Sequence, residues 1–208
     1  MTACGLPFSD PTAAHTHAYL WPVVERLLPS PAGGRLLDLG CGNGAFAQRL
    51  QSLGFQVTGV YPSPSGVGQA RSASEAAEFI EASAEPGLAG RIGTFPVIVS
   101  LEVIEHVFSP QSFSRCVQEL LEPGGRLILS TPYHGYWKNL ALALSGKLDG
   151  HFTALWEGGH IKFWSVETLT RLFTQAGLAR RSVHRVGRIP VLAKSMVLVF
   201  EKPHSGPA

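Results

Sequence analysis

An acidic residue followed by alternating glycines is the part of this sequence best suited to binding a ligand. Asp38 ends a short apolar run, and Gly40, Gly42 and Gly44 then occupy every second position. Because glycine has no Cβ, the backbone of such a turn can approach a ligand closely and adopt positive φ angles where needed. An amphipathic stretch follows directly, so its first unpaired N–H groups would face the same ligand. The pattern predicts a binding loop between a strand and a helix.

The spacing of this loop differs from the dinucleotide-binding fingerprint. That fingerprint reads G-x-G-x-x-G, with an acid about twenty residues later. Here the glycines follow G-x-G-x-G, and Asp38 lies two residues before the first of them. The spacing therefore argues against a nucleotide-binding oxidoreductase. A purely structural interpretation stays open, in which Asp38 caps the turn and the glycines only close it.

Histidines and aromatic residues gather in residues 133–164, and two more candidates lie near the N-terminus. The residues expected to contact a substrate are His15, Tyr19, Tyr133, His134, Tyr136, Trp137, His151, Trp156 and His160. Aromatic walls with a few titratable groups suit a pocket for a ring-shaped or sugar-like substrate. A lid packed on the core would also be aromatic, so both interpretations stay open. No metal site is predicted, because two histidines two residues apart lie on different helix faces.

Length and composition indicate one globular domain. The 208 residues are 45% hydrophobic and 15% charged, with a net charge of +2 and no basic run that would argue for a nucleic-acid partner. Three scattered cysteines suit a reducing compartment, so we expect a cytoplasmic protein. No apolar run reaches the roughly eighteen residues of a membrane span, although peripheral membrane contact stays open. The oligomeric state is not determined by these patterns.

Strand-like and helix-like segments alternate along the chain, which favours an α/β fold with a mostly parallel sheet. Within a single domain over residues 1–208 we expect four parts. These are an N-terminal helical cap (1–30), a cofactor-binding core (31–132), a substrate-side insertion (133–164), and a C-terminal helix and hairpin (165–202). A division of the first helix at Pro22 stays open. An abrupt turn is expected at residues 122–125, before a strand over residues 126–130.

Three motifs together resemble the class I S-adenosylmethionine-dependent methyltransferases. Residues 37–44 resemble the first motif of that family, and residues 121–125 resemble its Leu-x-Pro-Gly-Gly turn. Residues 101–107 resemble the segment after strand four in the subgroup that contains the ubiquinone-biosynthesis O-methyltransferases. The resemblance covers about residues 35–200. It implies a Rossmann-like methyltransferase fold, with a doubly wound seven-stranded sheet, helices on both faces and strand seven antiparallel.

The resemblance implies S-adenosyl-L-methionine as cofactor and S-adenosyl-L-homocysteine as product. In the family, the acid at the Asp38 position helps to hold the cofactor's amino group, and the glycines admit the ribose and the methionine chain. The residues that match the family's cofactor-binding positions are Asp38, Gly40, Cys41, Gly42, Asn43, Tyr61, Pro62, Ser83, Ala84, Ser100, Leu101, Glu102 and His106.

Tyr61 departs from the family pattern. The family carries an acid at the end of strand two, and this acid accepts hydrogen bonds from both ribose hydroxyls. A phenol offers one oxygen and no negative charge, so it cannot accept in the same two-pronged way. The departure implies weaker cofactor binding or a ribose that is held differently. It also supports an alternative function, a cofactor-binding protein of the same fold whose methyl transfer is weakened or lost.

The implied reaction is methyl transfer to a small-molecule acceptor, with oxygen the favoured acceptor atom. A hydroxyl acceptor needs a base, and histidine titrates in the appropriate pH range. His106 and His134 follow the fourth and fifth strands, so they are the expected catalytic residues. An alternative for His106 is a structural histidine bonded to nearby backbone.

Overall fold

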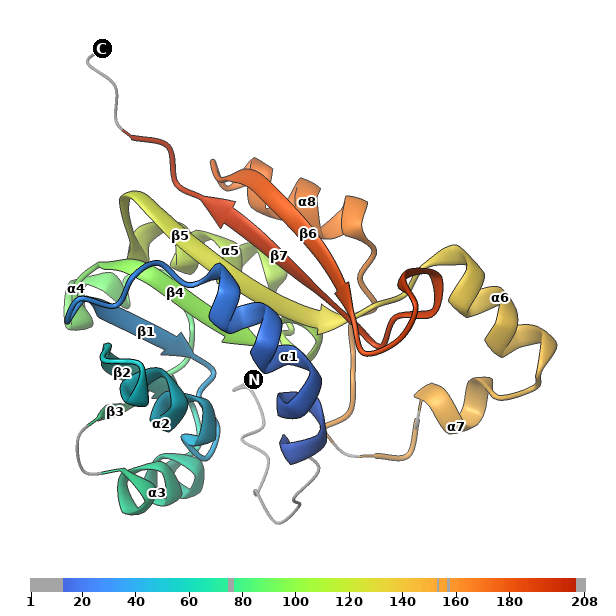
Figure 1. The fold of residues 1–208 in the computed structure, drawn as a ribbon, viewed down its shortest axis with the longest axis horizontal. Helices are drawn as coiled ribbons and strands as arrows, with labels where there is room; N and C mark the ends of the chain where they lie inside the picture. Colours follow the sequence, from blue (N-terminus) through green and yellow to red (C-terminus); the bar gives the residue numbers. More distant parts are fainter. Residues whose placement is uncertain (1–12, 75–76, 153, 157, 205–208) are drawn as a thin grey trace.

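Seven strands form one sheet that organises the molecule (Figure 1). The computed structural model describes residues 13–74, 77–152, 154–156 and 158–204. The strands are β1 (Arg35–Leu39), β2 (Gln56–Tyr61), β3 (Glu78–Glu81), β4 (Phe95–Leu101), β5 (Leu121–Pro132), β6 (Ala179–Val186) and β7 (Ser195–Glu201). They lie in the order β3-β2-β1-β4-β5-β7-β6, and β7 runs antiparallel to β5 and β6 while the other pairs are parallel. The predicted fold class is confirmed.

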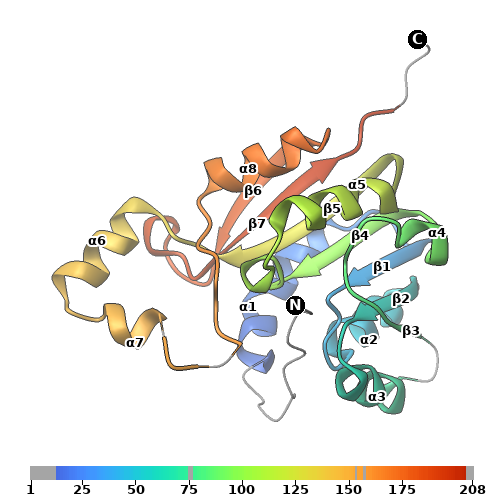
Figure 2. The ribbon, with the colours of Figure 1, turned by 180° about the vertical axis from the view of Figure 1, so that it is seen from behind.

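Helices cover both faces of the sheet. The helical elements are α1 (Ala13–Leu27), α2 (Ala45–Ser52), α3 (Pro64–Ala73), α4 (Ala89–Ile92), η1 (Ile104–His106), α5 (Pro110–Leu120), α6 (Tyr136–Leu144), α7 (Leu148–Phe152), α8 (Val166–Gln175) and η2 (Pro190–Leu192). Helices α1, α2 and α3 cover one face, and α5 and α8 cover the other (Figures 1 and 2). Along β1, Leu37 and Leu39 pack under α5 and α8, whereas Leu36 packs under the first three helices. This alternation explains why a strand buried on both faces is apolar throughout.

The glycine-rich loop joins β1 to α2 at the carboxyl edge of the sheet. The backbone N–H groups of Gly40 and Cys41 both donate to the carbonyl of Val60, at 2.8 and 3.1 Å, which fixes the loop to the end of β2. Gly40 has a φ of 96°, and a Cβ placed there would overlap the side chain of Val103. Glycine is therefore required both by the backbone conformation and by the close approach of the segment after β4.

Two local expectations differ from the structure. Helix α1 continues through Pro22 as one helix, and Ala18, whose carbonyl loses its usual helical donor, is exposed to water. The strand β5 begins before the turn expected at residues 122–125, so that turn is a bulge inside β5: Phe95 pairs with Leu121, Val97 pairs with Arg126, and Gly124 between them has a φ of 76°. The reason is a long-range pairing, because Gly124 donates to the carbonyl of Lys202 at 2.8 Å and Lys202 donates back to Gly125 at 2.9 Å.

The chain leaves the sheet after β5 and makes an excursion before it returns to α8. Helices α6 and α7 project from the carboxyl end of β5, at the right of Figure 1. Residues 158–164 then run back past η1. Among the helices in the described ranges, none is both long and apolar enough to cross a membrane.

Candidate active site

A pocket of about 570 Å³ opens at the carboxyl ends of β1, β2 and β4, where ligands bind in open α/β sheets. Its walls come from the glycine-rich loop, the end of β2, the segment after β3 and the segment after β4. The sequence-predicted cofactor residues that line it are Asp38, Gly40, Cys41, Gly42, Asn43, Tyr61, Pro62, Ser83, Ala84, Leu101, Glu102 and His106. Ser100 lies beneath this pocket, because its hydroxyl is buried and donates to the carbonyl of Leu39 at 2.8 Å.

Asp38 is a buried carboxylic acid at the pocket wall. Its Oδ2 atom is buried and has no hydrogen-bond partner among the described residues. Burial raises the pKa of Asp38 to about 7, because the low-polarity surroundings disfavour the charged form. A ligand ammonium group placed beside Oδ2 would supply the missing donor and restore the ionised form. The residues present therefore fit the amino group of S-adenosyl-L-methionine.

Tyr61 presents its side chain at the end of β2, where the family's ribose-binding acid would lie. The residue lines the pocket and is partly exposed. Gly66 of α3 leaves room for its ring, since a Cβ at Gly66 would lie 2.6 Å from Tyr61 Cδ1. The glycine at position 66 is thus the local feature that accommodates a ring instead of a carboxylate.

Glu102 is held at the pocket floor in an unusual backbone conformation. Its φ is 56°, in the left-handed region that residues other than glycine rarely adopt. Ser130 stabilises this conformation, because its hydroxyl accepts from the Glu102 N–H at 3.0 Å and donates to Oε1 at 2.7 Å. Ser195 donates to Oε2 at 3.2 Å, and the hydroxyl of Tyr19 lies 3.0 Å from Ser195 Oγ. Burial raises the pKa of Glu102 to about 7.

Tyr19 therefore has a structural contact where a substrate contact was expected. Its side chain joins α1 to β7, and the described pocket lining contains Thr16 and Leu20 of the same helix in its place. These two residues are four apart, so they lie on one face of α1. This face of α1 therefore forms part of the pocket wall. His15 belongs to α1, but its side chain lies outside the described residues.

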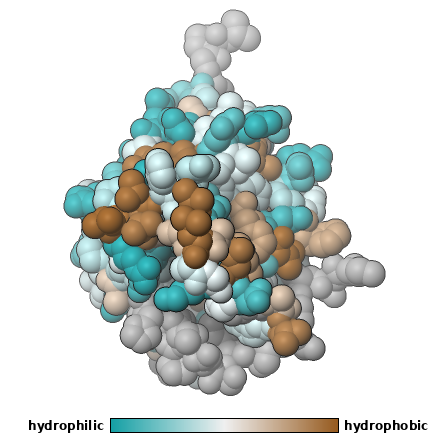
Figure 3. All heavy atoms as spheres, turned by 90° about the vertical axis from the view of Figure 1, so that its right-hand side faces the viewer, coloured by the Kyte–Doolittle hydropathy of each residue, from teal (hydrophilic) through white to brown (hydrophobic). Residues whose placement is uncertain are grey.

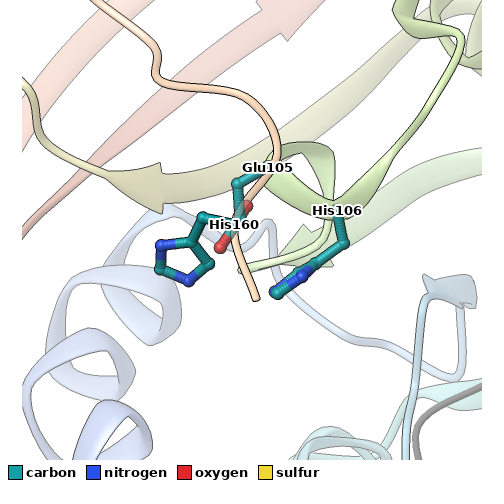
Figure 4. A group of neighbouring side chains, drawn as sticks. All are labelled: Glu105, His106 and His160. Carbon is teal, nitrogen blue, oxygen red and sulfur yellow. The ribbon is translucent and has the colours of Figure 1, made fainter. Parts of the chain in front are cut away.

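Glu105, His106 and His160 form a cluster beside the pocket (Figure 4). Each offers one ligand atom, and these atoms all lie within 4.8 Å of one another. The Glu105 carboxylate is buried and points between the two imidazole rings, whose centroids are 5.0 Å apart. Oε2 of Glu105 accepts from Thr131 at 3.1 Å, whereas Oε1 has no partner among the described side chains and backbone.

The returning segment brings His160 to this cluster. The carbonyl of Glu105 accepts from the N–H groups of Ile161 and Lys162, both at 3.0 Å. His106 Nδ1 lies 3.3 Å from the carbonyl oxygen of Gly159. A carbonyl can only accept, so this contact places the proton on Nδ1 and leaves a lone pair on Nε2. His106 thus makes the backbone contact of the structural interpretation, and it also lines the pocket.

The ionisation of the cluster follows from burial. Burial, together with the nearby Glu102 carboxylate, holds the pKa of Glu105 well above its usual range. Burial also lowers the pKa of His106, and it lowers that of His160 to about 4 with a further contribution from His106. Both imidazoles are thus neutral at pH 7, which leaves each able to accept a proton or to bind a cation.

The other expected substrate residues lie elsewhere. His134 packs in a separate group with His151, Phe152 and Phe163, at centroid distances of 5.5, 6.1 and 5.1 Å, and burial lowers its pKa to about 4. Tyr133 is buried, with the guanidinium of Arg185 over its ring.

Three of the expected substrate residues are exposed to solvent. Tyr136 is 73% exposed, Trp137 is 63% exposed and Trp156 is 55% exposed. Residues 133, 134, 136, 137, 151, 156 and 160 are all absent from the described lining of the pocket. The aromatic insertion therefore reaches the pocket through residues that sequence reasoning passed over, namely Gly158, Gly159 and Ile161. The segment after β4 likewise contributes Val107 and Phe108.

Sequence comparisons identify relatives of this chain. A family model described as "Methyltransferase domain" matches residues 13–183. The chain is 39% identical over 130 residues to a ubiquinone biosynthesis O-methyltransferase of Caulobacter sp. strain K31, covering 60% of this chain and 49% of the relative. It is 30% identical over 151 residues to the protein of the same name from Aromatoleum aromaticum, covering 71% and 64%. The chain thus spans about half to two thirds of the length of these relatives.

Structure comparisons give the same fold. A crystal structure of an S-adenosylmethionine-dependent methyltransferase from Mesorhizobium loti matches with a TM-score of 0.68 at 18% identity, covering 88% of this chain and 97% of the other. The magnesium protoporphyrin IX methyltransferase of Synechocystis PCC 6803, solved with bound S-adenosyl-homocysteine, matches with a TM-score of 0.61 at 21% identity, covering 92% and 81%. None of these matches supports the alternative of a binding protein without methyl transfer.

We expect Asp38→Asn to weaken binding of S-adenosyl-L-homocysteine about ten- to hundredfold, because a hydrogen bond to a charged group contributes about 1.5–3 kcal/mol. In the wild-type protein, affinity should fall as the pH drops below about 7, since protonation then removes the charge of Asp38. Isothermal titration calorimetry across this pH range measures both effects. The exposed Asp149 on α7 provides a matched control, Asp149→Asn. Equal affinity of Asp38→Asn and wild type would contradict the assignment.

We expect Tyr61→Asp to tighten binding of the same ligand about tenfold, because a carboxylate accepts from both ribose hydroxyls and a phenol does not. Tyr61→Phe keeps the ring beside Gly66 and should change affinity little. Calorimetry again provides the measurement. Weaker binding in both variants would show instead that the Tyr61 hydroxyl makes a ribose contact of its own.

Proposed function

This chain belongs to the methyltransferase domain family, and from that premise we propose that it methylates a hydroxyl oxygen of a small-molecule acceptor at the Glu105–His106–His160 cluster. The observation that carries the proposal is the position of this cluster, since His106 lines the cofactor pocket and the other two residues lie directly behind it. We propose S-adenosyl-L-methionine as the methyl donor and the cluster as the place where the acceptor is activated.

The pocket residues divide between holding the cofactor and facing the acceptor. When bound, S-adenosyl-L-methionine supplies a sulfonium methyl group that is transferred by in-line displacement. Asp38 would hold the amino group of the cofactor, and the glycine-rich loop admits its chain because no side chain obstructs the approach. The sulfonium group is already reactive, so the protein mainly aligns the acceptor and excludes water.

Oxygen as the acceptor atom is supported by the cluster and by the relatives. A hydroxyl must lose its proton when it is methylated, and His106, whose Nδ1 faces the carbonyl of Gly159, would take that proton on Nε2. Neutral imidazole is the correct starting form for this role. The curated relatives carry the name ubiquinone biosynthesis O-methyltransferase, which is consistent with an oxygen acceptor. Val107, Phe108 and Ile161 provide an apolar wall for the body of such an acceptor.

A second way of activating the hydroxyl is favoured by Glu105. Its Oε1 atom is buried without a partner and points between two neutral imidazoles. One carboxylate and two imidazoles are donors that suit zinc or another first-row divalent cation. Such an ion would be held by Glu105, His106 and His160, and it would make a coordinated hydroxyl more acidic. The sequence did not reveal this site, because His160 is distant in the chain from Glu105.

The compartment is inferred from the cysteines, and the size of the acceptor is inferred from the pocket. Cys41 and Cys116 are buried free thiols, which supports a reducing compartment such as the cytoplasm. We propose a small-molecule acceptor because a pocket of about 570 Å³ has room for a compact molecule beside the cofactor.

Replacing His106 by alanine tests its role as the base. We expect kcat for methylation of hydroxylated aromatic acceptors, with catechol as the reference compound, to fall at least about hundredfold, because general-base catalysis contributes that much or more. Binding of S-adenosyl-L-homocysteine, measured by calorimetry, should change far less. His134→Ala is the matched comparison, since that histidine packs outside the described pocket lining. If kcat fell in His134→Ala and not in His106→Ala, His134 and not His106 would be the base.

Metal analysis tests the role of Glu105. If the cluster holds a cation, wild-type protein loaded with zinc and then desalted should retain about one ion per chain, and Glu105→Gln or His160→Ala should retain much less. Mass spectrometry of the metal content measures this without reference to activity. His151→Ala is the control histidine. Undiminished turnover after chelation, with no retained metal, would leave proton transfer by His106 as the remaining activation.

A further inference from the structure

A chain of side-chain hydrogen bonds runs from the floor of the pocket to helix α1. The hydroxyl of Ser195 donates to Oε2 of Glu102 at 3.2 Å, and the phenolic oxygen of Tyr19 lies 3.0 Å from Ser195 Oγ. A hydroxyl has one hydrogen, and Ser195 gives its hydrogen to Glu102, so Tyr19 is the donor to Ser195. Both bonds therefore point from α1 toward the carboxylate. We call these two bonds the Tyr19–Ser195–Glu102 link.

The link joins two parts of the pocket lining. Glu102 lines the pocket directly, and Thr16 and Leu20 line it from α1, on either side of Tyr19 in the sequence. Ser195 is fixed between them, because it begins β7 and pairs in the sheet with Pro132 at the end of β5. The link thus ties the α1 wall of the pocket to its floor through a residue that the sheet holds in place.

The floor depends on contacts of this kind. Glu102 has a φ of 56°, and a residue other than glycine keeps such a backbone conformation only where its surroundings hold it. Ser130 bonds to the Glu102 N–H and to Oε1, whereas Ser195 bonds to Oε2. Loss of the bond from Ser195 would leave the carboxylate held through one oxygen instead of two.

Helix α1 is held unevenly along its length. From Leu20 onward it is anchored in the core, since Leu20 and Val24 are fully buried. Before Leu20, Thr16 and Tyr19 are only partly buried and Ala18 is exposed. The phenolic hydroxyl of Tyr19 is therefore placed to hold the less buried part of α1 against the sheet.

We propose that Tyr19 is a positioning residue for the cofactor, which acts on the Glu102 floor through Ser195 and on the α1 wall through its own helix. This inference rests on the proposed function, because the ligand that contacts both wall and floor is taken to be S-adenosyl-L-methionine or its product. Such a ligand binds best when wall and floor are held together. By reciprocity, its binding should also stabilise the start of α1.

A purely structural role for the hydroxyl has a different signature. A bond that served only to anchor α1 would affect thermal stability and would change nothing at Glu102. Tyr19→Phe separates the two roles, because it removes the hydroxyl and keeps the ring, whose centroid lies 5.3 Å from the Lys194 ammonium.

Hydrogen exchange of the ligand-free protein, measured by NMR, tests the link without the cofactor. We expect Tyr19→Phe to speed exchange of the Glu102 N–H about two- to tenfold, because loss of one hydrogen bond shifts the local opening equilibrium by such a factor. Ser195→Ala should do the same. Exchange at Glu102 equal to that of wild type in both variants would overturn the proposal.

Tyr136→Phe is the matched control. Tyr136 begins α6 and is 73% exposed. Figure 3 views the molecule from the side on which α6 projects in Figure 1, and apolar side chains are exposed there in several groups between polar ones. Loss of a hydroxyl on this side should leave exchange at Glu102 and ligand binding as in wild type.

Stopped-flow measurement of S-adenosyl-L-homocysteine dissociation tests the effect on the cofactor. The rate should rise about two- to tenfold in Tyr19→Phe and at least as much in Ser195→Ala. The double variant should dissociate no faster than Ser195→Ala, since both substitutions break the same link. Addition of the ligand should slow exchange of the amides of residues 18–20 in wild type, and less so in Tyr19→Phe.

Two results would overturn the inference alone. One is normal ligand binding with unchanged dissociation rates in Tyr19→Phe and Ser195→Ala. The other is a double variant in which the two single effects multiply, because the residues would then act independently. Wild-type protein that bound no S-adenosyl-L-homocysteine would instead overturn the proposed cofactor, and this inference with it.

Discussion

The close approach of two loops at the carboxyl edge of the sheet is the constraint on which the site depends. Gly40 and Val103 occupy adjoining space, and a Cβ at position 40 would overlap the valine. This approach sets Asp38, near the end of β1, and Glu102 of the second loop in the lining of one pocket. Because β1 and β4 are neighbouring parallel strands, their carboxyl ends meet at the same edge, and the absence of one side chain lets the loops converge there.

The site is built from acids that the fold keeps away from water. Asp38, Glu102 and Glu105 are all buried enough to raise their pKa values, but their carboxyl oxygens differ in how many hydrogen bonds they accept. Glu102 is satisfied by the hydroxyls of Ser130 and Ser195, whereas Asp38 and Glu105 each keep one buried oxygen unpaired. Unpaired buried oxygens are costly, so they mark the places where a ligand group completes the structure. The amino group of the cofactor and an acceptor or cation at the cluster would fill these two places.

Local spacing predicted the parts of the site that local structure determines. Asp38 and the glycines of the first loop lie within one strand–turn–helix unit, so their pattern in the sequence is also their arrangement in space. The pairing of Glu105 with His160 was not predicted, because backbone hydrogen bonds bring the two residues together across more than fifty residues of sequence. Tyr19 was expected at the substrate but is bonded to Ser195, a pairing that no local pattern could indicate. The extension of β5 through residues 122–125 depends in the same way on Lys202.

Residues 158–164 supply their own hydrogen bonds to η1. The hydrogen bonds that fix His160 near Glu105 come from Gly159, Ile161 and Lys162, all within the returning segment itself. Helices α6 and α7 lie upstream of these bonds. The excursion contacts the returning segment at Phe163, through His134 and Phe152, whereas the bonds at Glu105 do not involve it. Its length and outer surface can therefore change over evolutionary time while the reactive groups keep their positions.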